Sequence, residues 1–174
     1  MLGGHTIEST EPFFGWVVNG LADADGLWRN AGAQPGDLLL LTKPIGTGLW
    51  ATAAKHGVAD EQGWQRACEL MRQPNRRAAE LLRGATPHAV TDVTGFGLLG
   101  HLWETTRASG VEAEIRFGAV PWLGGAWELA AANVVPGGSL ANLDHVGGAV
   151  SWDDEIPRVG RILLCDAQTS GGLL

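Results

Sequence analysis

The sequence predicts a single domain of the α/β or α+β sandwich class, in which helices pack on a sheet. Short apolar runs typical of buried strands alternate with longer segments of helical pattern that end at glycines. A length of 174 residues suits one domain, and 45% hydrophobic with 18% charged residues is ordinary for a folded globular protein. The chain begins beside a Gly-Gly turn and stops at SGGLL, so we expect the sandwich to be incomplete at both ends.

A short strand is expected around WVVNG, and four further segments after residue 35 are predicted to be strands. The first is a continuous apolar run that Pro44 and Gly46 stop, which is typical of a buried strand. Another alternates apolar and polar residues, as a half-buried strand does. The four predicted strands cover residues 36–44, 89–94, 111–117 and 161–166.

Helices are predicted between these strands from local stop and start signals. Gly57 ends a first helix over LWATAAKH, and Asp60 is a candidate N-cap for the long helical pattern that follows. Pro74 interrupts that pattern, so two consecutive helices or one kinked helix are expected before Gly84. A further helix carries Leu98, Leu99 and Leu102 on one face and stops at Gly110, and WELAAAN is expected to form another.

Composition and charge exclude several classes of protein. A formal net charge of -7 and the lack of a Lys/Arg-rich run argue against nucleic-acid binding. No secretory leader or stretch of membrane-spanning length is visible, so we expect a cytoplasmic protein with no membrane partner. Cys68 and Cys165 lie far apart and outside any CxxC spacing, which predicts neither a zinc site nor a disulfide.

Asp92 is the strongest candidate for ligand chemistry. It follows the apolar start of a predicted strand and precedes a glycine-rich turn into a helix, in the stretch AVTDVTGFGLLGH. Strand ends and helix N-termini are where α/β proteins place ligands, and a carboxylate there is a hard oxygen ligand for Mg²⁺. The alternative is that Asp92 only caps the helix.

Three further groups could bind a phosphorylated ligand, each with a simpler alternative. Gly3 and Gly4, followed by His5 and Thr6, would offer backbone N–H groups beside an imidazole and a hydroxyl, or they are only a turn. Lys43 could reach a phosphate, or it is a solvated lysine at a strand end. The segment PGGS (136–139) is a potential anion-binding nest or a plain loop.

Three other side chains are weaker candidates. His101, one helical turn beyond Gly97, is more typical of a packed or capping histidine than of a base. Cys165, on a predicted buried strand, should be inert, and Asp166 is expected to begin a turn.

Six segments, taken in order, closely resemble the selenophosphate synthetase family, also called selenide, water dikinase, within the aminoimidazole ribonucleotide synthetase-like superfamily. The resemblance covers nearly the whole chain, and its most specific strings are TDVTGFGLLGH and CDAQTSGGLL. The segments are GGHTIESTEPFFGWVVNG, GDLLLLTKPIGTG, MRQPN, AVTDVTGFGLLGH, VVPGGS and LLCDAQTSGGLL.

The resemblance implies an ATP-dependent phosphotransferase that converts selenide, ATP and water into selenophosphate, AMP and orthophosphate. It further implies a homodimer that uses ATP as substrate with Mg²⁺, no nucleic acid and no membrane. Family members use the Asp of TDVTGFG as a Mg²⁺ ligand, which points to Asp92 as the metal residue in place of the cap. Their GGHT segment approaches the nucleotide across the dimer interface, which points to Gly4, His5 and Thr6.

The resemblance also implies that this chain lacks part of the active site. The family's catalytic Cys or selenocysteine with a nearby Lys lies in an N-terminal half that has no counterpart here, so no catalytic residue is assigned. The expected organisation is the end of an N-terminal domain and linker over residues 1–35, then a C-terminal domain over 36–174, cut before its last elements. That domain is an α+β sandwich in the family, with helices on a mixed sheet. The alternative function is a non-catalytic nucleotide-binding or dimerisation module.

Overall fold

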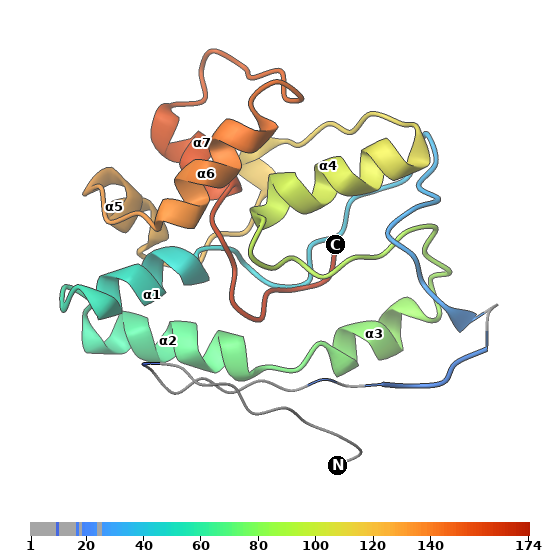
Figure 1. Cartoon of the computed structure of the whole chain (residues 1–174), viewed down its shortest axis with the longest axis horizontal. Helices are drawn as coiled ribbons and strands as arrows, with labels where there is room; N and C mark the ends of the chain where they lie inside the picture. Colours follow the sequence, from blue (N-terminus) through green and yellow to red (C-terminus); the bar gives the residue numbers. More distant parts are fainter. Residues whose placement is uncertain (1–9, 11–16, 18, 24–25) are drawn as a thin grey trace.

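The computed structural model describes residues 10, 17, 19–23 and 26–174, and helices and extended loops make up this part of the chain. Figure 1 shows α2 and α3 following one another along one side of the molecule, with α4, α6 and α7 grouped on the opposite side and extended segments between. The elements are α1 (Thr47–Lys55), α2 (Glu61–Arg72), α3 (Arg76–Leu82), α4 (Gly97–Ser109), the 3₁₀ turn η2 (Phe117–Ala119), α5 (Ala126–Ala131), α6 (Gly137–Val146) and α7 (Arg158–Leu164).

The expected sandwich of helices on a mixed sheet is wrong for the described residues, which contain no sheet. Backbone pairing is limited to two isolated bridges, a parallel one between Ile45 and Trp122 and an antiparallel one between Asp92 and Leu173. Residues 38–41 and 112–115 make no backbone hydrogen bond with other residues that the structure describes. A β-ladder needs successive residue pairs along two strands. Each of the two bridges is a single pair, so neither forms a ladder.

The strand predicted over 161–166 is also wrong, because most of this segment is helix α7. A short apolar run fits a buried strand and a buried helix equally well by periodicity. The helix buries Ile162, Leu163 and Leu164 together and places Gly160 against the ring of Phe117, where a Cβ would be 2.7 Å from the ring. Residues 158–164 are therefore helical because neighbouring parts of the chain pack against more than one side of them.

Helix α6 was not predicted, because its buried side carries no apolar stripe. The residues that it buries are Ser139, Asn142 and Val146, of which two are polar. Their spacing is helical, but only Val146 contributes a hydrophobic signal. The segment PGGS, interpreted as a nest or a loop, is the start of this helix.

The remaining helix signals are confirmed. Asp60 caps α2 by accepting a hydrogen bond of 2.8 Å from the backbone N–H of Gly63. Pro74 separates α2 from α3, and Gly110 ends α4 with a φ of 69° in the left-handed region. The predicted apolar face of α4 is buried at Leu98, Leu99 and Leu102.

The main hydrophobic core joins α4, α6 and α7 to the extended segments. Val93 and Ile45 are buried in it beside Leu98, Leu99 and Leu164. Two smaller clusters pack α1 against α2, α5 and α7. Among the described residues, no helix is both long and apolar enough to cross a membrane.

Candidate functional site

Asp92 lies on an extended segment whose backbone is held by the last residues of the chain. Thr91 and Leu174 exchange two backbone hydrogen bonds of 3.0 and 2.9 Å, and the N–H of Val93 donates to the carbonyl of Gly172 at 2.8 Å. Val93 is fully buried, whereas Asp92 is exposed. Alternation along an extended chain therefore anchors the segment on one side and presents the carboxylate on the other.

The helix-cap alternative for Asp92 does not hold. Helix α4 begins at Gly97, and its N-cap is Phe96, which makes no side-chain cap hydrogen bond. The Asp92 carboxylate accepts no hydrogen bond from any residue that the structure describes. It is thus available to an external ligand.

Gly97 is required where the turn after Asp92 enters α4. Its φ is 70°, and a Cβ at this position would lie 2.6 Å from the carbonyl oxygen of Cys165. Only glycine combines this backbone conformation with so close an approach. The two strings that carry the resemblance therefore touch each other at this point.

His101 holds the turn that follows Asp92. Its Nε2 accepts a 3.0 Å hydrogen bond from the backbone N–H of Thr94 and lies 3.1 Å from the Thr94 hydroxyl. Burial lowers the pKa of His101, and the carboxylates of Glu104 and Asp92 only partly oppose this effect. The side chain is thus a neutral acceptor, which confirms the expectation of a packed, capping histidine.

The final segment of the chain fits closely against the Asp92 segment. A Cβ on Gly171 would collide with the carbonyl oxygen of Val93, and one on Gly172 would lie 2.6 Å from the backbone nitrogen of Lys43. The carbonyl of Gly171 also accepts a 2.9 Å hydrogen bond from the Asn75 side chain. Three distant segments therefore converge on residues 171 and 172.

Lys43 links two of these segments, and it is not the solvated lysine that one alternative expected. Its ammonium donates to the carbonyls of Gln73 and Ser170, both at 2.7 Å, and the residue is only 6% exposed. Burial lowers the pKa of Lys43. It is thus not solvated, and two of its three donors are already used by the protein.

Asp166 is a buried carboxylate that ties α1, α6 and the final segment together. It accepts hydrogen bonds from the backbone N–H of Gly48 at 3.1 Å, the hydroxyl of Ser139 at 2.9 Å and the side-chain amide of Gln168 at 2.8 Å. Burial raises the pKa of Asp166 to about 6, against the opposite effect of these hydrogen bonds. The sequence predicted only that Asp166 begins a turn, whereas its side chain is buried and caps α1.

Gln168 completes this cap and was not singled out from the sequence. Its Oε1 accepts hydrogen bonds from the backbone N–H groups of Gly46 and Thr47 at 3.0 and 3.2 Å. Ser139 likewise links Asp166 to the backbone N–H of Ala167. A helix N-terminus needs acceptors for its first N–H groups, and here residues over 100 positions away supply them.

The two cysteines differ in their burial. Burial, with a further contribution from the Asp166 carboxylate, raises the pKa of Cys165 to about 12, so it is inert as expected. Cys68 is a half-buried residue of α2. No group of three or more His, Cys, Asp or Glu side chains within the described part could by itself hold a metal ion.

The other candidate positions lie outside the described residues. Gly4, His5 and Thr6, assigned to nucleotide binding by the resemblance, fall in the segment that the structure does not describe. Of the predicted site, the structure therefore places Asp92 alone.

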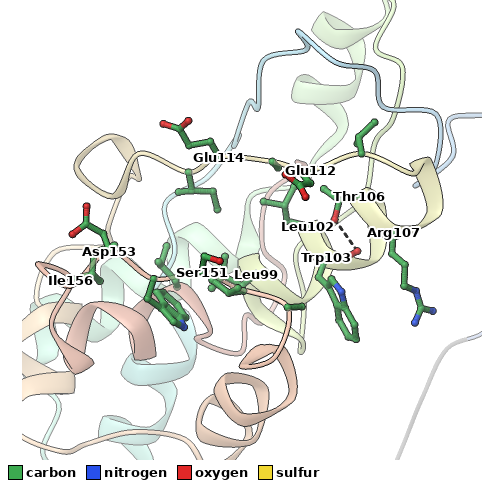
Figure 2. Close-up of a pocket in the computed structure, with 17 residues that line it drawn as sticks. Leu99, Leu102, Trp103, Thr106, Arg107, Glu112, Glu114, Ser151, Asp153 and Ile156 are labelled. Atoms are coloured by element: carbon green, nitrogen blue, oxygen red, sulfur yellow. Dashed lines mark hydrogen bonds between the residues drawn. The ribbon is translucent and has the colours of Figure 1, made fainter.

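A cavity of about 700 Å³ lies between α4, residues 111–115 and residues 149–156. Figure 2 shows Leu99 and Leu102 among its lining residues, with the acidic side chains of Glu112, Glu114 and Asp153 around it. Asp92 does not line this cavity, and the acidic side chains would repel a triphosphate. The cavity is therefore not the site that the sequence predicts.

Comparisons with known proteins identify relatives along the entire chain. The chain is 43% identical over all of its 174 residues to "Selenide, water dikinase" of Paraburkholderia xenovorans, and this match covers 49% of that protein. Proteins of the same name from Myxococcus xanthus and Carboxydothermus hydrogenoformans are 44% and 41% identical, again across the whole chain and half of each relative. The chain thus spans about half the length of these curated relatives.

A protein-family model matches residues 34–136, which is more than half of the chain. The matched stretch contains Lys43, Asp92 and His101, together with helices α1 to α5. The chain therefore belongs to the family described as AIR synthase related protein, C-terminal domain.

Proposed function

We propose that the full-length protein makes selenophosphate from selenide, ATP and water, and that this chain contributes Asp92 as a Mg²⁺ ligand. The observation that supports the reaction is an identity of 41–44% over the whole chain to proteins named for it. The proposed reaction releases AMP and orthophosphate. One phosphoryl group of ATP is transferred to selenium and water takes up the other.

The environment of Asp92 suits a magnesium ligand. Mg²⁺ commonly uses one or two carboxylates and completes its shell with water and phosphate oxygens. Asp92 offers an exposed carboxylate that accepts no hydrogen bond from the described part of the chain, on a backbone that Gly172 and Leu174 hold on one side. When bound, the ion would neutralise charge that develops on the phosphate oxygens during transfer.

His101 has a supporting role in this proposal. By accepting from the N–H of Thr94, it fixes the turn two residues after Asp92. The carboxylate then keeps its direction when phosphate oxygens approach. This is a positioning role, since the imidazole Nε2 is already occupied.

The described residues also favour a chain that is inactive alone. Cys165 is buried as a thiol, and Lys43 and His101 are occupied by internal hydrogen bonds. As the family resemblance implies, we propose that the reacting Cys or selenocysteine, its Lys and most metal ligands lie in the remaining part of a full-length cytoplasmic homodimer. Gly4, His5 and Thr6 are proposed to contact the nucleotide there.

The test is Asp92→Asn in the full-length protein. We expect the rate of selenophosphate and AMP formation, followed by phosphorus NMR under anaerobic conditions, to fall on the order of 100-fold or more. Binding of Mn²⁺ in the presence of ATP, followed by electron paramagnetic resonance, should weaken in parallel. Glu69→Gln removes an exposed carboxylate on α2 and is the matched control.

The result also separates the proposal from its alternative. Normal turnover and Mn²⁺ binding in Asp92→Asn would contradict the metal assignment. If the wild-type full-length protein binds nucleotide but forms no selenophosphate, the chain belongs to a non-catalytic nucleotide-binding or dimerisation module. If the 174-residue chain alone forms selenophosphate, the division of the active site is wrong.

A further inference from the structure

Residues 170–174 are hydrogen-bonded to two other parts of the chain. One part is the Asp92 segment, where the backbone of residues 91–93 donates to and accepts from theirs. The other part includes Thr42, whose N–H donates to the carbonyl of Leu173 at 3.0 Å and whose hydroxyl accepts from the Leu173 N–H at 2.7 Å. The backbone that carries Asp92 is therefore held, through residues 170–174, by contacts made elsewhere.

Lys43 is the charged group among these contacts. Its ammonium donates to the carbonyls of Ser170 and Gln73, so it joins residues 170–174 to the connection between α2 and α3. No carboxylate of the described residues forms an ion pair with this buried ammonium. Burial of a charge is costly, and hydrogen bonds from a charged donor are roughly twice as strong as neutral ones. Lys43 thus holds Ser170 and Gln73 in fixed relative positions.

Asn75 binds the next residue of the final segment from the same short connection. Its Nδ2 donates to the carbonyl of Gly171 at 2.9 Å. Its Oδ1 is buried, and no residue that the structure describes donates to it. The amide therefore contributes through its donor. Because Pro74 restrains the backbone between Gln73 and Asn75, the two attachments belong to one rigid connection.

The path from these attachments to Asp92 runs through the backbone alone. The carbonyl of Gly172 accepts from the N–H of Val93 at 2.8 Å, and a Cβ on Gly171 would collide with the Val93 carbonyl. Asp92 is the residue before Val93, and its carboxylate accepts no hydrogen bond from the described residues that could hold it independently. A shift of residues 170–172 would therefore move the carboxylate.

We propose that Lys43 and Asn75 are positioning residues for the Asp92 carboxylate. They act through Ser170 and Gly171 on the backbone that carries Asp92, and neither side chain touches the ion or the nucleotide. The inference rests on the proposed role of Asp92 as a magnesium ligand. It gives Lys43 a role in the reaction that differs from direct contact with a phosphate.

The test measures Mn²⁺ binding in the presence of ATP, by electron paramagnetic resonance, in full-length protein that carries Lys43→Met or Asn75→Ala. We expect the dissociation constant of Mn²⁺ to rise about 10-fold in Lys43→Met and by a smaller factor in Asn75→Ala, because groups that hold a metal ligand in place contribute about 10–100-fold to metal affinity. Lys55→Met, at the exposed end of α1, and Gln65→Ala, on the exposed side of α2, are the matched controls and should leave it unchanged.

Two further measurements separate positioning from a general loss of stability. In protein that already carries Asp92→Asn, Lys43→Met should change the Mn²⁺ dissociation constant by less than ~2-fold, because the carboxylate that Lys43 positions is gone. Hydrogen exchange of residues 91–95, followed by mass spectrometry, reports on the intermediate step. The amide of Val93 should exchange at least ~3-fold faster when Lys43 or Asn75 is changed.

Three results would overturn the proposal. If Asp92→Asn weakens Mn²⁺ binding but Lys43→Met and Asn75→Ala do not, these residues only stabilise the fold and the metal assignment stands. Equal weakening by Lys43→Met with and without Asp92 would show that it does not act through the carboxylate. Normal Mn²⁺ binding in Asp92→Asn would remove the proposed metal ligand and the positioning role with it. If Lys43→Met does not fold, Asn75→Ala decides, since it leaves the buried ammonium in place.

Discussion

The buried carboxylate of Asp166 makes the stability of this chain depend on pH in an unusual direction. Its pKa is about 6 in the folded chain, against 3.8 as the ordinary value. The folded state therefore binds this proton more tightly than the unfolded state, and protonation stabilises folding. Between pH 7 and pH 4.5, the linkage relation gives a gain of about 2 kcal/mol from this group.

Asp166→Asn isolates the effect because it keeps the size of the side chain and removes the titration. Urea unfolding, followed by tryptophan fluorescence, measures the free energy of unfolding at each pH. As the pH falls from 7 to 4.5, the wild-type chain should gain about 2 kcal/mol relative to the variant. Above pH 7 the difference should be constant.

The control and the contrary outcome are clear. Asp144→Asn removes an exposed carboxylate from α6 and shows what the loss of a surface charge does to the profile. If the wild type instead loses stability relative to Asp166→Asn at low pH, the hydrogen bonds from Gly48, Ser139 and Gln168 outweigh burial. The reasoning on the raised pKa would then be refuted.

Three further outcomes are expected. Gly171→Ala should lower the free energy of unfolding by about 2 kcal/mol or more, measured by urea unfolding, because its Cβ would collide with the Val93 carbonyl; Gly118→Ala, whose Cβ meets nothing within 4 Å, is the control. His101→Phe should cost about 1–3 kcal/mol in the same assay, since the N–H of Thr94 loses its acceptor, and full stability would contradict that role. A thiol reagent at neutral pH should modify Cys68 and leave Cys165 unmodified until urea is added, and rapid reaction of both thiols would contradict the burial of Cys165.

The helices that could be predicted are those whose boundaries depend on local chemistry. Asp60 caps α2 through a side chain three residues from its partner, and Pro74 and Gly110 act on the backbone where they stand. These residues begin or end a helix whatever the helix packs against. The sequence also predicted Asp92 as a candidate ligand residue, and the structure shows it exposed next to the buried Val93.

The features that could not be predicted depend on partners far along the chain. The run over 161–166 is helical because neighbours on both sides bury it, and α6 buries Ser139 and Asn142 against polar partners. The sequence around Asp166 indicates a turn, because Gly48 and Ser139, which hydrogen-bond to its carboxylate, are far away in the sequence. The prediction of a sheet was wrong for the same reason. An extended segment forms a strand only when a second extended segment pairs with it, and the local sequence does not show whether such a partner is present.

The two strings that carry the family resemblance form one structural unit. The N–H of Gln168 donates to the carbonyl of Thr94 at 2.9 Å. Position 97 lies so close to the carbonyl of Cys165 that only glycine fits there. The N–H of Val93 in turn donates to Gly172, so both ends of the Asp92 turn rest on the final segment. A carboxylate that makes no hydrogen bond of its own within the described residues can keep its position only through its backbone. The close approach of Gly171 and Gly172 therefore helps to position the proposed magnesium ligand through the backbone on which Asp92 stands.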